Sequence, residues 1–122
     1  MHKSFKPEDL MAILEGIQDA VVKLDANSNC IAMNGAAADI FRRLGRDPQQ
    51  MLGKSLWELF PDVKGTIVEQ KIREMLEHDV HVQYEFYYPA DQRWYETRGY
   101  PSSKGAILIF RDITQQKAAQ SG

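Results

Sequence analysis

The residues that could carry metal or acid–base chemistry in this sequence are few. Of its three histidines, His78 and His81 lie close together with Asp79 between them, a grouping that could supply metal ligands. They straddle the expected end of a helix and start of a strand, however, and such a junction does not hold two imidazole rings at a defined separation. We therefore interpret them as solvated residues at a helix end, where the negative pole of the helix dipole favours histidine.

The single cysteine, Cys30, is interpreted as a structural residue. One cysteine cannot form an intramolecular disulfide, so a secreted, disulfide-stapled scaffold is excluded and a reducing compartment fits better. No flanking His, Lys or Arg would lower the pKa of the thiol, so it reads as a small buried hydrophobe. Because no converging set of acids, bases and nucleophiles accompanies it, we predict that the chain is not an enzyme.

Aromatic side chains gather in the last third of the chain. They could line a small-molecule pocket, with Tyr95, Thr97 or Arg98 as polar handles. Aromatic residues are also common in β-sheets, so plain core packing is the simpler interpretation. The group comprises Tyr84, Phe86, Tyr88, Trp94, Tyr95, Tyr100 and Phe110.

Composition limits the classes of partner. The 122 residues suit one domain, and 43% apolar with 26% charged residues can form a core. The net charge of -2 shows no excess of the basic residues that bind nucleic-acid phosphates. The longest apolar run, 106–110, is too short to cross a bilayer, and residues 1–5 lack a signal-peptide apolar region. We expect a cytoplasmic chain with no nucleic-acid partner and no direct membrane contact.

Hydrophobic spacing and capping residues predict the helices. Apolar residues recur at helical spacing over 7–16 and again over 35–44, where Asn34 can cap the helix. Asp47, Ser55 and Thr66 each stand three residues before Gln or Glu, so each can begin a helix and satisfy two free amides. The longest helix is expected over 66–78.

Five strands are expected beside these helices. Residues 18–25 and 29–34 flank a polar turn and predict a β-hairpin. Apolar and polar residues then alternate over 80–88, and turns separate 93–101 from 105–114. The order predicts an α+β fold in which a five-stranded antiparallel sheet carries helices on one face.

Three local motifs in this arrangement resemble the PAS family, over about residues 10–117. Residues 17–22 and 31–37 are similar to its first hairpin and first core helix, with Asn34 at the usual helix start. Residues 53–61 resemble the Gly-x-x-hydrophobic segment before its long helix. The Asp-Ile-Thr ending of 109–114 is the most specific motif, because in the family it marks the handover from the last strand to an output helix.

The resemblance implies a sensory domain of a bacterial signalling protein, such as a histidine kinase or diguanylate cyclase. It implies a PAS domain over 10–114, preceded by a tail and helix start (1–9) and followed by the start of an output helix (115–122). The first hairpin should lie beside the last strand. Asp112, Ile113 and Thr114 would transmit the signal to an output domain in the same or a partner chain, and a homodimer is expected.

The resemblance also directs attention to a pocket between the long helix and the inner sheet face. Its expected walls are Val68, Ile72, Phe86, Tyr95, Thr97 and Leu108. The occupant is open: a small-molecule ligand fits the pattern, but the cofactor is unknown.

Two cofactors known in the family are disfavoured here. Haem-binding members use a histidine inside the long helix, whereas His78 falls in its last turn. Flavin-binding LOV domains carry Asn-Cys-Arg just before the long helix region, whereas residues 53–56 read Gly-Lys-Ser-Leu. Two alternatives to a ligand sensor stay open: a ligand-free structural dimerisation module, and a small α+β isomerase that would need a buried carboxylate base.

Overall fold

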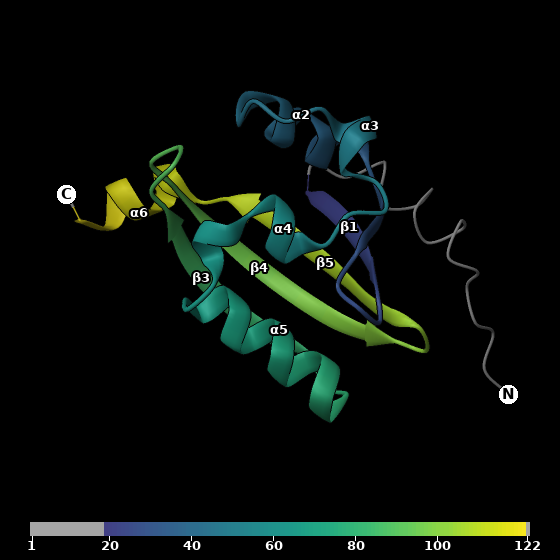
Figure 1. The fold of residues 1–122 in the computed structure, drawn as a ribbon. Helices are drawn as coiled ribbons and strands as arrows, with labels where there is room; N and C mark the ends of the chain where they lie inside the picture. Colours follow the sequence, from purple (N-terminus) through teal and green to yellow (C-terminus); the bar gives the residue numbers. More distant parts are fainter. Residues whose placement is uncertain (1–18, 122) are drawn as a thin grey trace, which may run out of the picture.

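The computed structural model describes residues 19–121 and has the predicted α+β architecture, a five-stranded antiparallel sheet with helices on one face (Figure 1). The strands are β1 (Ala20–Asp25), β2 (Cys30–Met33), β3 (Val82–Tyr88), β4 (Arg93–Ser102) and β5 (Gly105–Asp112). The helices are α2 (Gly35–Arg43), α3 (Pro48–Met51), α4 (Leu56–Leu59), the 3₁₀ helix η1 (Pro61–Val63), α5 (Ile67–His78) and α6 (Thr114–Ser121). The predicted helix at 7–16 lies outside the described residues.

The strand order is β2-β1-β5-β4-β3, which confirms that the first hairpin lies beside the last strand. β5 is therefore central, with β1 and β4 as its neighbours. In this register Val22 of β1 pairs with Leu108 of β5, and Tyr95 of β4 pairs with Asp112 at the end of β5. Because both pairs are antiparallel, the junction between β5 and α6 lies beside the start of β4.

The helix starts follow the predicted caps. Asp47, Ser55 and Thr66 each accept a hydrogen bond from the backbone N–H two residues on, at 3.0 to 3.2 Å. The reciprocal bond from the cap's own N–H to the Gln or Glu side chain three residues on forms at none of these three caps; at the third, Glu69 accepts from the N–H of Gly65 and not from that of Thr66. None of the helices within 19–121 is both long and apolar enough to cross a bilayer.

Asn34 joins the hairpin to α2. Its Oδ1 accepts from the N–H groups of Ala37 (3.0 Å) and Val21 (2.9 Å), and its Nδ2 donates to the carbonyl of Asp19 (3.0 Å). The side chain is buried, so water cannot reach these polar groups. Each bond therefore supplies the partner that water would otherwise provide. One residue thus caps the helix and fixes the start of the first strand.

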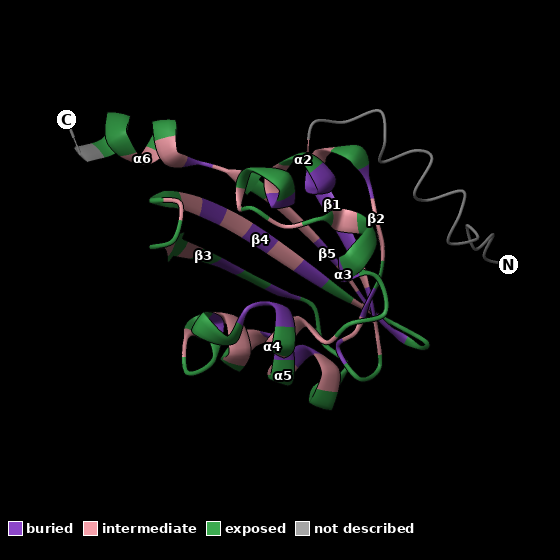
Figure 2. Ribbon diagram, turned by 45° about the horizontal axis from the view of Figure 1, so that its top comes forward, coloured by how far each residue is buried: buried purple, intermediate pink, exposed green. Residues whose placement is uncertain are grey.

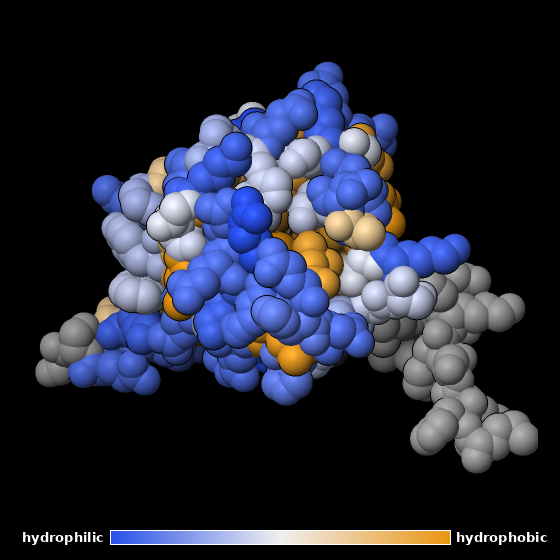
Figure 3. All heavy atoms as spheres, turned by 60° about the horizontal axis from the view of Figure 1, so that its bottom comes forward, coloured by the Kyte–Doolittle hydropathy of each residue, from blue (hydrophilic) through white to orange (hydrophobic). Residues whose placement is uncertain are grey.

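The core lies between the inner face of the sheet and the helices α2 to α5. Buried and less buried residues alternate along β4, as the bands of Figure 2 show. Gly99 permits the close approach of α5, since a Cβ there would stand 2.7 Å from the sulfur of Met75. Seen from the side on which α5 lies, the surface is largely hydrophilic with small separate hydrophobic patches (Figure 3).

Several strand boundaries differ from the predicted ones by one or two residues, and two of these differences have a local cause. Val80 was expected to open β3, but it is exposed and the strand begins at Val82. The reason is that Asp79, directly after the last residue of α5, has a left-handed conformation (φ 55°), and the chain turns back to the sheet over the residues that follow. The last strand ends at Asp112 and not at 114, because α6 already begins at Thr114.

Candidate functional site

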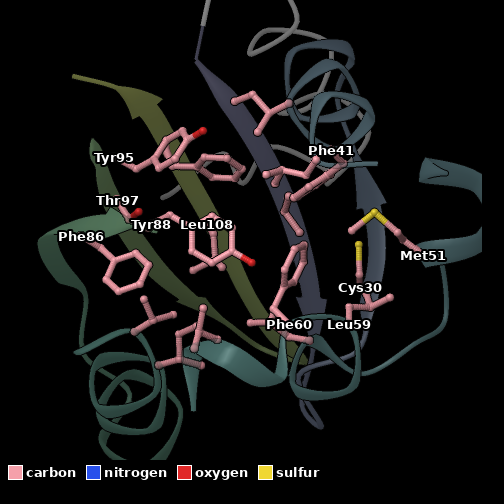
Figure 4. Close-up of a pocket in the computed structure, with 18 of the residues that line it drawn as sticks. Cys30, Phe41, Met51, Leu59, Phe60, Phe86, Tyr88, Tyr95, Thr97 and Leu108 are labelled. Atoms are coloured by element: carbon pink, nitrogen blue, oxygen red, sulfur yellow. The ribbon is translucent and has the colours of Figure 1, made fainter. Parts of the chain in front are cut away.

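An apolar cavity lies between α5 and the inner face of the sheet. Its volume is about 130 Å³, and its wall extends from α5 and the sheet to α2 and the stretch from α3 to η1 (Figure 4). The structure brings all six residues expected at a pocket onto its wall: Val68, Ile72, Phe86, Tyr95, Thr97 and Leu108. A role for them in ligand binding stays a prediction.

The rest of the wall includes residues that were not predicted to line a pocket, among them Phe41 of α2 and Phe60. These two form a chain of rings with Tyr88, a member of the aromatic group expected as possible pocket residues, with centroid separations of 5.7 Å and 6.4 Å. Phe41 also lies 6.1 Å from Phe110 of β5. The apolar stripe of α2 could have identified Phe41, but Phe60 follows a four-residue helix that is too short to show a period.

The hydroxyl groups of the wall have partners within the protein. Tyr95 donates its hydroxyl hydrogen to Asp91, and its hydroxyl oxygen accepts a hydrogen bond from Arg43 at 3.5 Å. Burial raises the pKa of Tyr95, and the hydrogen bond to Asp91 and its charge raise it further. Burial raises the pKa of Tyr84 to about 12, although a hydrogen bond with Thr97 acts in the opposite direction. These phenols are therefore neutral at physiological pH.

Charged groups are kept at the edge of the cavity, and none of the lining residues is Asp, Glu, Lys, Arg or His. Arg46 donates to the carbonyl of Leu59, and its guanidinium carbon lies 5.1 Å from the centroid of the Phe60 ring. For Tyr88, burial raises the pKa and the nearby Asp62 raises it further. The cavity itself is therefore an uncharged environment.

Cys30 lies on this wall and is fully buried, as the interpretation of a small buried hydrophobe requires. Burial raises the pKa of its thiol, which keeps it protonated and unreactive. His78 is the last residue of α5, and neither it nor His81 lines the cavity. His81 instead stacks on Tyr100 at 6.2 Å. Within residues 19–121 no group of three or more His, Cys, Asp or Glu side chains could hold a metal ion.

The junction between β5 and α6 is fastened to β4 by backbone and side-chain bonds. Asp112 accepts from the N–H of Thr114 at 2.9 Å and from Arg93 at 2.6 Å. Ile113 donates its N–H to the carbonyl of Trp94 at 2.9 Å. The hydroxyl of Thr114 accepts from the N–H of Trp94 at 2.9 Å. Asp112 therefore supplies the cap, while Thr114, the other residue expected as a possible cap, ties the helix start to β4.

A second set of contacts holds the first turn of α6. The ammonium group of Lys117 lies 4.8 Å from the centroid of the Trp94 ring and forms an ion pair with Glu85 of β3. Trp94 adjoins Tyr95, whose side chain is on the opposite face of β4 and lines the cavity. The cavity wall and the anchor of α6 are thus consecutive residues of one strand.

Comparisons with known proteins agree with this architecture. A family model described as "PAS fold" matches residues 14–118. The structure is similar to a PAS domain from Colwellia psychrerythraea, with 20% identity and a TM-score of 0.68 over 88% of this chain and 97% of that one. It is also similar to the PAS domain of nitrogen regulation protein NR(II) from Vibrio parahaemolyticus, with 16% identity and a TM-score of 0.63 over 85% and 97% of the two chains.

A third similar structure carries a ligand. It is the PAS domain of the RpfR quorum-sensing receptor from Cronobacter turicensis in complex with BDSF, with 19% identity and a TM-score of 0.64 over 80% of this chain and 96% of that one. At these identities the likeness shows a shared fold. No curated protein sequence gave a significant match.

Proposed function

The chain belongs to the PAS fold family, and from that premise we propose that it is a sensory or regulatory domain of a bacterial signal-transduction protein such as a histidine kinase or diguanylate cyclase. It binds a small molecule in the apolar cavity and passes the change to an output domain in its own or a partner chain. It works in the cytoplasm, as a homodimer, and catalyses nothing.

One observation carries this proposal: the cavity and the start of α6 share β4. A ligand that displaces Tyr95 acts on the residue next to Trp94, and Trp94 holds both Ile113 and Thr114 through its backbone. A shift of one residue's backbone therefore reaches the first turn of α6 directly. Asp112, Ile113 and Thr114 are the transmission residues in this mechanism, and the wall residues are the receptor.

The test is native mass spectrometry and an absorption spectrum of the full chain purified from cells under non-denaturing conditions. Bound mass or visible colour that disappears on denaturation supports the sensor. A chain that is always empty, with a cavity that no added compound enters, contradicts ligand sensing.

A ligand-free dimerisation module is the second candidate function, favoured by the outer face of the sheet. Tyr87 and Tyr100 are each 40% exposed there, and Tyr87 packs against Trp94 with ring centroids 5.6 Å apart. Such exposed aromatic side chains are typical of interface cores. The isomerase alternative has less support, because no carboxylate lies on the cavity wall.

A further inference from the structure

We infer that the cavity selects a small, uncharged, largely apolar molecule, of about the size of a benzene ring with one short substituent. This inference rests on the proposed function, because it names the class of ligand that the same cavity would sense.

The wall supplies no counter-ion. Ile72 and Leu108, at opposite sides of the cavity, present hydrocarbon, and no side chain on the wall is charged. A ligand carboxylate or ammonium group would lose its hydration there without gaining a partner, at a cost far above that of burying a neutral polar group. Charged compounds are therefore excluded from the interior.

The polar atoms of the cavity wall have few free hydrogen-bonding positions for a strongly polar ligand. The hydroxyl of Tyr95 is engaged by Asp91 and Arg43, and the hydroxyl of Tyr84 interacts with Thr97. Within the described residues no buried side-chain nitrogen or oxygen atom is left without a hydrogen-bond partner. A ligand can thus make a single hydrogen bond, for example to Thr97, but a sugar or nucleotide would bury many unpaired groups.

The nearest guanidinium groups are occupied and lie at the edge. Arg43 is bound to Tyr95, and Arg46 is bound to Leu59 and lies over Phe60. An anionic amphiphile, such as a fatty acid, would have to break one of these contacts to pair its carboxylate. That makes decanoate the strongest rival ligand and a necessary arm of the test.

The volume sets the size. A dry, apolar cavity of about 150 Å³ in another protein binds benzene. The present cavity, at about 130 Å³, is similar in volume, and its wall is mostly aliphatic and aromatic, with three tyrosines and Thr97 among its residues. A single substituted ring fits this space, whereas a macrocycle or fused-ring cofactor would require the walls to separate.

The experiment uses four probes of nearly one shape and a long-chain anion: toluene, phenol, benzoate, benzylammonium and decanoate. Each is titrated into the full chain while the methyl NMR signals of Ile72 and Leu108 are followed. We expect toluene and phenol to shift these signals saturably and to raise Tm. Benzoate and benzylammonium should bind at least about a hundredfold more weakly.

Two neighbouring substitutions in α5 provide a matched pair. Val68 lines the cavity, whereas Ile67 is 39% exposed and does not. V68F fills the cavity and should abolish toluene binding, while I67F adds the same ring outside and should leave it unchanged. Circular dichroism checks folding, and V68L replaces V68F if the larger side chain prevents folding.

Each outcome decides something. If benzoate or decanoate saturates the same methyl signals at or below the concentration needed for toluene, the inferred ligand class is wrong but the cavity remains a sensor site. If no probe of any charge shifts the Ile72 and Leu108 signals, both the inference and ligand sensing fail. Toluene binding that survives V68F or V68L places the site elsewhere and overturns the inference.

Discussion

At the scale of single residues, the buried side chain of Asn34 makes the most demanding set of bonds. It satisfies the backbone N–H groups of Val21 in β1 and Ala37 in α2, and the carbonyl of Asp19 just before β1. Removing a partner from a buried donor costs more than the net value of the bond, because the donor keeps its desolvation penalty. The position therefore tolerates few residue types.

We predict that N34A lowers the free energy of unfolding by about 2 to 4 kcal/mol, because Val21 and Ala37 both lose their acceptor. N34S keeps a cap for Ala37 but is too short to reach Val21, so its loss should be about half as large. Urea denaturation measures both. A loss below about 1 kcal/mol for N34A would show that water or a neighbouring group takes over these bonds.

Asn34 also illustrates what sequence can reveal. Its capping role followed from an apolar stripe after a polar residue, which is a local pattern. The bond to Val21 is not local, since it joins residues 13 apart in sequence and depends on how the hairpin closes. Thr114 is similar: its type suits a cap, yet only the pairing of β4 with β5 brings the N–H of Trp94 to its hydroxyl.

At the scale of elements, the junction from β5 to α6 combines a cap with an ion pair. Burial tends to raise the pKa of Asp112, but the bonds from Thr114 and the charge of Arg93 outweigh it and lower the pKa below its ordinary value. A carboxyl group with a lowered folded-state pKa stabilises the fold above its unfolded pKa. That contribution is lost as the pH falls from about 4 through the lowered value.

We predict that D112A loosens the start of α6, with a stability loss of about 0.5 to 2 kcal/mol. D112N is the matched control, because its amide oxygen still accepts from Thr114 while the charge toward Arg93 is gone. Hydrogen exchange of the α6 amides and unfolding at several pH values measure the effects. D112N should lose part of the acid-dependent stability change but protect α6 better than D112A.

To test signalling, D112A and T114A are introduced together into the full-length protein. The double variant D112A/T114A should remain folded and respond less to its stimulus, because it removes the Asp112 cap and the bond between Trp94 and the Thr114 hydroxyl, two of the contacts that hold the helix start. If its response keeps the wild-type amplitude, the junction is not the route of transmission.

The elements themselves could be predicted well from the sequence, whereas only part of the cavity wall could be predicted: six of its residues were expected there, but others, such as Phe41 and Phe60, were not. Alternation along residues 82–88 and the caps at Ser55 and Thr66 are periodic or local signals, and the structure contains both. The rest of the wall depends on how α2 and the stretch from α3 to η1 pack together. No periodicity records that packing, because α4 is one turn long.

At the scale of the whole molecule, the two faces of the sheet differ in what covers them. Helices α2 to α5 bury the inner face, while the outer face carries aromatic residues beside ion pairs such as Arg111–Glu96 (3.4 Å). If this face joins two copies, association should be sensitive to charge at Tyr100 and insensitive to charge on the helical side.

We predict that Y100K weakens dimerisation at least about tenfold, which corresponds to about 1.4 kcal/mol. L52K is the matched control, because Leu52 is 47% exposed and follows α3 on the helical side. Sedimentation velocity over a range of concentrations measures both. Equal effects of the two substitutions, or a wild-type chain that stays monomeric, would rule out the outer face as the interface.

The position of Trp94 has an optical consequence. The chain contains two tryptophans, and Trp57 belongs to α4, so W57F leaves an indole only where α6 meets the sheet. Indole emission depends on the polarity and charge around the ring, and here the nearby charge is the ammonium group of Lys117 on the helix itself. The wavelength and lifetime of Trp94 emission would therefore change when α6 docks on the sheet or leaves it, in real time and without an attached dye.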